Sequence, residues 1–161
     1  LGLAAGKDIA TIKALYGQFI KFATHSIYVT PRLVTAAVVH PAPQPDAAKL
    51  SELKVLKALP DGTALITVPR YEAFMNYAQA LAAQGVDFRE IAGNRSVILV
   101  SLIGPADWHP RVGIDKELIE QPMLTQPGRK RVVATTHVPE LGAALREWAQ
   151  GGVQVEHVFD Y

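Results

Sequence analysis

The sequence of 161 residues contains no cysteine. Disulfide bonds, thiolate metal sites and cysteine nucleophiles are therefore excluded, whereas both the cytoplasm and the periplasm remain compatible with the chain. An excess of charge of one sign is missing as well, because Lys and Arg number 16 and Asp and Glu number 15. A net charge of +1 provides no field that would steer the chain to a polyanion, so we expect no nucleic-acid partner.

Long hydrophobic runs are also absent. The hydrophobic fraction of 49% is that of an ordinary globular protein, and no apolar run approaches the roughly 18 residues of a membrane span. The sequence opens on Leu1 rather than Met, and the short apolar run before Lys7 fits two interpretations. It is either the end of a removed signal peptide or membrane anchor, or the edge of a trimmed sequence. The first interpretation favours a periplasmic or membrane-attached protein, held through residues that precede Leu1, and the cytoplasm stays open.

Motifs that carry catalysis or hold cofactors are missing too. The sequence has no nucleophile motif, no Walker-type phosphate loop and no dinucleotide fingerprint. Its five histidines are scattered, without the spacing of metal ligands. We therefore predict no cofactor and no metal, and we lean toward a protein without enzymatic activity.

An internal repeat dominates what the chain does contain. Ala64-Leu-Ile-Thr-Val-Pro is followed by a helical run and Gly85-Val-Asp-Phe, and Ala134-Thr-Thr-His-Val-Pro is followed by a shorter helical run and Gly152-Val-Gln-Val. Each copy has the pattern of a strand, a Val-Pro corner, an amphipathic helix, a glycine stop and a second strand. The repeat predicts two βαβ units, residues 63–91 and 131–159, with helices over residues 70–84 and 139–150.

The two units are separated by Gly93-Asn94, which is a hairpin signal. Two βαβ units joined by an antiparallel hairpin resemble the ferredoxin-like split-βαβ fold, which also underlies the ACT-type regulatory domains. We therefore predict an α+β fold in which both units share one antiparallel sheet and both helices cover the same face, with Phe74 and Trp148 at related core positions. The resemblance is architectural, because Val-Pro replaces the Asp-x-x-Gly turn with which ACT domains often hold amino acids.

The N-terminal part has a different character. Residues 8–24 have apolar side chains at helical spacing, which predicts an amphipathic helix with one apolar stripe. Three prolines in residues 40–45 form a stiff connector, so we place a boundary between residues 1–45 and an α+β domain of residues 46–161. The stripe packs on the later domain of this chain, on another subunit, or close to a membrane surface. Its residues are Ile9, Ile12, Leu15, Phe19 and Phe22.

Four shorter segments complete the prediction. Residues 33–39 are rich in β-branched side chains beside Pro31 and predict an edge strand. Residues 46–59 have leucines at helical spacing and predict a short helix, and residues 115–120 predict a helical turn. The basic run at residues 128–131 predicts a solvated turn.

Strand alternation gathers polar residues on the helix-free face of the predicted sheet. A histidine near carboxylates and an arginine can bind an anion or carry acid–base chemistry, although a solvated sheet face uses the same residue types. An aromatic residue beside a histidine in the irregular segment that follows can shape a pocket. His157, which alternates with Val155 and Phe159, is expected in the core. The candidate ligand residues are Thr67, Arg89, Thr135, His137, Glu156, Trp108 and His109.

These observations favour a non-enzymatic interaction or sensor module, serving as a subunit or extramembrane domain of a larger assembly. We expect a protein partner or a homo-oligomer. Two alternatives remain open. One is a small enzyme of the dimeric ferredoxin-like barrel type with its pocket on the open sheet face, and the other is an ACT-like domain that senses a small ligand.

Overall fold

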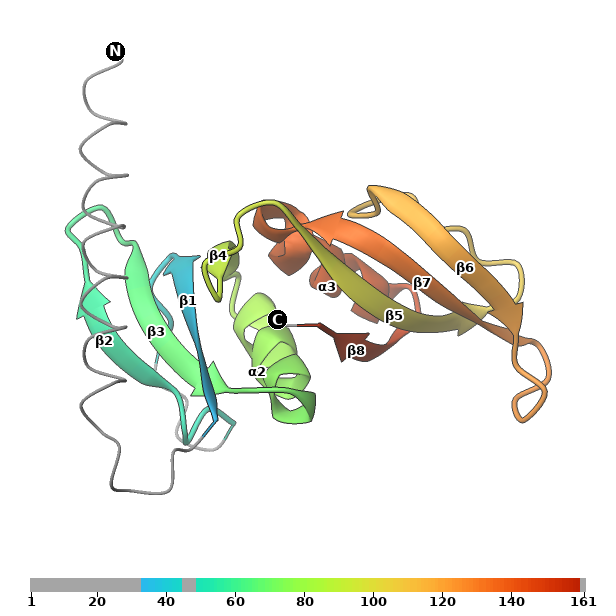
Figure 1. The fold of residues 1–161 in the computed structure, drawn as a ribbon, viewed down its shortest axis with the longest axis horizontal. Coiled ribbons are helices and arrows are strands. Elements are labelled where there is room, and N and C mark those ends of the chain that lie inside the picture. Colours follow the sequence, from blue (N-terminus) through green and yellow to red (C-terminus); the bar gives the residue numbers. More distant parts are fainter. Residues whose placement is uncertain (1–32, 45–48, 160–161) are drawn as a thin grey trace, which may run out of the picture.

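The computed structural model of the chain describes residues 33–44 and 49–159. These residues form two antiparallel four-stranded sheets and two α-helices, which is an α+β architecture (Figure 1). No helix in the described ranges is long and apolar enough to cross a membrane. The predicted amphipathic helix of residues 8–24, with its apolar stripe, lies outside the described residues.

The first half of the chain forms sheet A and one helix. The strand order is β2-β3-β1-β4, and all neighbouring strands are antiparallel. Because β3 and β4 both run antiparallel to β1, they are parallel to each other, and α2 connects them. The elements are β1 (Val34–His40), β2 (Lys54–Ala58), β3 (Ala64–Pro69), α2 (Glu72–Ala83) and β4 (Asp87–Ile91).

The second half forms sheet B with the same order, β6-β7-β5-β8. Its strands are again antiparallel to their neighbours, and α3 connects β7 to β8. The elements are β5 (Val97–Pro105), β6 (Lys116–Pro122), β7 (Arg129–His137), the short 3-10 helix η1 (Val138–Glu140), α3 (Leu141–Gln150) and β8 (Gln154–Val158).

The strands therefore lie in two sheets, where the repeat in the sequence predicted one. The turn between β4 and β5 has Ala92 and Gly93 at its centre, with φ of 50° and 85°, and Ile91 and Asn94 exchange backbone hydrogen bonds across it. This tight turn passes the chain from one sheet to the other, and β5 pairs with β7 and β8 instead of β4. Period-two patterns specify strands but not their partners, so the sequence could not reveal this exchange.

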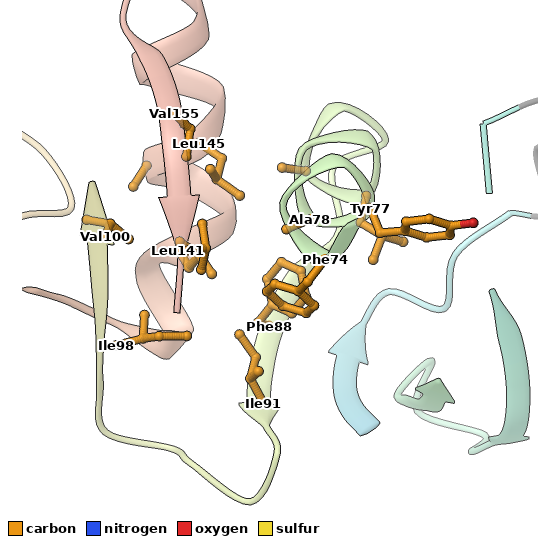
Figure 2. Close-up of a cluster of buried hydrophobic side chains, with 14 of the residues drawn as sticks. Phe74, Tyr77, Ala78, Phe88, Ile91, Ile98, Val100, Leu141, Leu145 and Val155 are labelled. Atoms are coloured by element: carbon orange, nitrogen blue, oxygen red, sulfur yellow. The ribbon is translucent and has the colours of Figure 1, made fainter. Parts of the chain in front are cut away.

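A single hydrophobic core joins the halves. Helix α2 packs against α3, β3 and β8, while α3 also packs against β4, so the helices form a layer between the sheets. In Figure 2, Phe74 and Ala78 of α2 point toward Leu141 and Leu145 of α3. Trp148 is 2% exposed, which agrees with its predicted place in the core.

Phe74 and Trp148 do not, however, occupy related positions. Each helix is followed by a glycine with positive φ, Gly85 after α2 and Gly152 after α3. Counting back from these glycines, Phe74 corresponds to Leu141, whereas Trp148 corresponds to Leu81 of the first half.

Three predicted local structures differ from those observed. The strand β1 is the interior strand of sheet A, between β3 and β4, and not an edge strand. The helix predicted over residues 46–59 is wrong where the structure describes it, because Lys54–Ala58 form β2. Residues 115–120 likewise contribute to β6 and not to a helical turn. The predicted boundary after residue 45 falls between β1 and β2, two strands of one sheet.

The two missed strands occupy equivalent edges of their sheets, and β-bulges explain the misleading pattern. The register of β2 against β3 shifts at Leu56, and that of β6 against β7 shifts at Leu118. A bulge inserts one residue into the strand, so side chains three residues apart point to the same face. That spacing imitates the period of a helix.

Candidate functional site

The candidate residues Thr135 and His137 lie on the outer face of sheet B, the face without helices. The Asp115 carboxylate accepts a hydrogen bond from Thr135 Oγ1 at 3.1 Å, and its Oδ1 lies 3.3 Å from His137 Nε2. The Asp115 backbone N–H donates to the Thr135 carbonyl at 2.8 Å. The three residues thus form one polar cluster, which fastens the loop before β6 to the end of β7.

A second cluster on the same face contains Glu156. Its carboxylate receives two hydrogen bonds from the Arg131 guanidinium, at 2.7 Å from Nε and 2.5 Å from Nη2, and one from Ser101 Oγ at 2.6 Å. These donors, the arginine first, lower the pKa of Glu156 from its ordinary 4.5, and burial opposes them. Because the Arg131 guanidinium and the Glu156 carboxylate pair with each other, this arrangement stabilises β8 on the sheet.

A bulge in β8 decides where His157 points. The register of β5 against β8 shifts between Ser101 and Leu102, so Val155 and Val158 are both buried although they are three residues apart. His157 is half-buried and packs edge-on against Phe159, with ring centroids 4.3 Å apart. The predicted core position of His157 is therefore wrong, because the bulge reverses the alternation that predicted it.

Two further candidates, Thr67 and Arg89, lie on sheet A. Thr67 is buried, at 6% exposure, whereas Arg89 is exposed on β4. By strand register they hold the positions that Thr135 and Glu156 hold in sheet B. The helix-free face that was predicted to gather all these residues is thus divided between two sheets.

The outer face of sheet A is also different in character. Ala36, Val38 and Leu65 form a small buried apolar cluster there, with Leu59 packed against it. The corresponding positions in sheet B include Ser101, on the same face as the Arg131–Glu156 pair. The centre of the outer face is therefore polar in sheet B and apolar in sheet A.

The remaining candidates, Trp108 and His109, follow β5. The Trp108 ring lies against Gly104, where a side-chain Cβ would come within 2.7 Å of the ring. Trp108 also packs against the core, while His109 is exposed. Trp108 therefore covers the end of the core, and these two residues lie apart from the outer-face clusters.

A buried cation at this end of sheet B was not among the predicted site residues. Lys130 is only 3% exposed, and its Nζ lies 3.2 Å from the carboxylate of Glu120 on the neighbouring strand. This pairing, opposed by desolvation, lowers the pKa of Glu120 from its ordinary value. The basic run is thus the beginning of β7 and not a solvated turn, and strict alternation from Val132 and Ala134 would have placed Lys130 on the inner face.

Pockets and metal sites offer little for catalysis in the described ranges. A hollow at the β6–β7 hairpin is lined by one charged side chain, Arg131, beside residues 121–125. No group of three or more His, Asp or Glu residues in this part of the chain is arranged to hold a metal ion. The chemistry available is that of paired surface charges.

The edge strands β2 and β6 form the most accessible surfaces. Every residue of both strands is exposed. Each has two large apolar residues near its middle, which are Val55 and Leu56, 45% and 41% exposed, and Leu118 and Ile119, 48% and 54% exposed. Neither surface was expected, because the apolar spacing in both segments predicted helical structure.

Comparison with known proteins adds no family. No family model matches the chain, and neither the curated proteins nor the solved structures contain a match.

Proposed function

We propose that the chain is a non-enzymatic interaction module, a subunit or extramembrane domain of a larger assembly, which binds its partners through the exposed edges of its two sheets. The observation that carries this proposal is the exposure of β2 and β6, each with an apolar pair at its centre. An edge strand presents unpaired backbone N–H and C=O groups, so it is a template for another strand. Proteins usually cover or shorten such edges.

The paired charges on the outer face of sheet B support a binding role over catalysis. Glu156 is held by Arg131 and Ser101, and Asp115 contacts both Thr135 and His137. A barrel enzyme or a small-ligand sensor needs polar groups that converge on a pocket. The groups on this face contact one another, and this leaves the enzyme and ACT-like alternatives with less support.

We also propose that each half is a split-βαβ unit of the ferredoxin-like kind, extended by one edge strand. In the first half, β3 and β4 are parallel, separated by β1 and linked by α2. In the second half, β7 and β8 are parallel, separated by β5 and linked by α3. Both arrangements support this relationship. The apolar stripe of residues 8–24, and attachment to a membrane through residues before Leu1, remain predictions.

Selection of random peptides displayed on phage against the full chain tests the edge-binding role. We expect extended peptides with alternating apolar residues, whose affinity falls at least tenfold for Ile119→Lys or Val55→Lys, because a charge is placed at the centre of an edge. Thr135→Ala, on the outer face of sheet B, is the control and should bind these peptides unchanged. Loss of binding by Thr135→Ala alone would favour a ligand sensor, and no enrichment at all would contradict the proposal.

A further inference from the structure

The two exposed edges have opposite charge around similar apolar centres. In β2, Lys54 and Lys57 flank Val55 and Leu56, and no acidic residue lies in the strand. In β6, Glu117 and Glu120 flank the apolar pair of Leu118 and Ile119, and Lys116 begins the strand, so the acidic residues outnumber the basic one. The order of residue types, charged-apolar-apolar-charged, is the same in both strands.

The bulges place each pair of like charges on one face of its strand. Lys54 is opposite Thr67 and Lys57 is opposite Leu65, two residues apart on β3, so both lysines point to the same face. In sheet B, Glu117 is opposite Ala134 and Glu120 is opposite Val132, so both glutamates also share one face. That face is the inner one, whereas the lysines share the outer face of sheet A. Without the bulges, residues three apart would point to opposite faces.

The two edges match when they are set antiparallel. Pairing Lys54 with Glu120 brings Val55 opposite Ile119, Leu56 opposite Leu118 and Lys57 opposite Glu117. Both lysines then meet glutamates on one face of the joined sheet, and the bulged residues meet each other. Opposite charges and apolar side chains directly across a strand pair stabilise it by about 0.2–1 kcal/mol each.

Other pairings of these edges are less favourable. A β2–β2 contact places lysines near lysines, and a β6–β6 contact places glutamates near glutamates, which is destabilising. Within one chain the two strands lie at opposite ends of the molecule (Figure 1), so they do not meet. Among the described strands, β2 pairs with β3 alone and β6 with β7 alone.

We infer that β2 of one copy of this chain pairs with β6 of a second copy. This inference rests on the proposed edge-binding function and names a second copy as the partner. The contact is heterologous, so each copy keeps one free edge of each kind and the copies assemble head to tail into rings or filaments. Salt weakens the association, because exposed charges contribute to it.

Charge reversal tests the pairing in the full chain. In the proposed register, Lys57→Glu places two acidic residues opposite each other at the position where Lys57 meets Glu117. Glu117→Lys places two basic residues opposite each other at the same position, and it retains the Glu120–Lys130 ion pair. We expect the wild-type mass in sedimentation velocity to rise with protein concentration up to about 1 mM, the range of weak contacts. The association constant of each variant alone should be at least tenfold lower than that of the wild type. An equimolar mixture of the two should regain the association, because every contact between the two variants again places opposite charges across the strand pair.

The controls are Lys49→Glu and Glu147→Lys, which make the same charge changes at exposed positions outside β2 and β6. Both should associate as the wild type does. A wild type that stays monomeric at every concentration, or a mixture that fails to associate, would overturn the pairing. If the wild type still binds the selected peptides and Ile119→Lys does not, the edge-binding function is supported even when the pairing of two copies is not. The two proposals can therefore fail separately.

Discussion

Val68 and Thr136 occupy the same position in the two sheets. Val68 is opposite Thr35 on β1, and Thr136 is opposite Ile98 on β5, at corresponding points of the two registers. Both side chains are 0% exposed. The Thr136 hydroxyl nevertheless has no hydrogen-bond partner in the described part of the chain. The second half therefore contains a buried polar atom where the first half contains a methyl group.

Replacing Thr136 by valine should stabilise the protein by about 1 kcal/mol, because the change removes an unsatisfied hydroxyl at nearly constant volume. The reciprocal change, Val68→Thr, should destabilise it by about 1–3 kcal/mol for the same reason. Urea unfolding monitored by circular dichroism measures both. If Thr136→Val is destabilising, the Thr136 hydroxyl has a favourable partner. The prediction that an unsatisfied hydroxyl lowers the stability of the second half would then be wrong.

Helix α3 meets β4 at a position that tolerates no side chain. A Cβ on Gly142 would lie 2.5 Å from Asp87 Oδ1 and 2.7 Å from the Val86 carbonyl oxygen. Asp87 is held there by Arg146, whose Nη2 donates to Oδ1 at 2.8 Å.

We expect Gly142→Ala to destabilise the protein by about 1–3 kcal/mol, because this clash outweighs the gain in helix propensity. Gly151→Ala is a matched control, since its Cβ would find its nearest neighbour at 3.5 Å, and it should stay within about 0.5 kcal/mol of the wild type. Thermal unfolding of both variants tests this prediction. A Gly142→Ala protein as stable as the wild type would show that α3 can shift away from β4.

Phe74 and Trp148 anchor the shared core from the two helices, at 0% and 2% exposure. Truncating either to alanine should cost about 3–5 kcal/mol, through lost burial and the cavity left behind. Gln79→Ala, at an exposed position of α2, should change the free energy of unfolding by no more than about 0.5 kcal/mol. A loss below about 1 kcal/mol in chemical denaturation would exclude the truncated residue from the core.

The Arg131–Glu156 pair should make stability depend on acid pH. Because the folded pKa of Glu156 lies below 4.5, the folded state favours the ionised form. The resulting stabilisation is present above pH 4.5 and is lost as the pH falls through the lower folded pKa. Glu156→Gln should therefore be less stable than the wild type at pH 7, and the difference should shrink toward pH 3. Chemical unfolding of both proteins between pH 3 and pH 7 measures this difference in stability. A difference that does not change with pH would show that Glu156 acts through packing and not through its charge.

The local sequence determined the elements with strong periodicity. The helices, their glycine stops and the strands on either side were predicted within a few residues, because the apolar residues of α2 and α3 face a core at period 3.6 and those of β7 alternate. Strand alternation also placed Thr135 and His137 together on an outer face. These properties depend on near neighbours in the chain, so the sequence contains them.

Only the tertiary structure decided which strands pair and where the register shifts. Insertion of β1 between β3 and β4 and of β5 between β7 and β8 made two sheets out of the single predicted one. Bulges at Leu56 and Leu118 put like charges on one face of each edge, and the bulge in β8 moved His157 away from the core. Pairing and register depend on contacts between residues far apart in the chain, and a bulge costs too little to leave a signal in the local pattern.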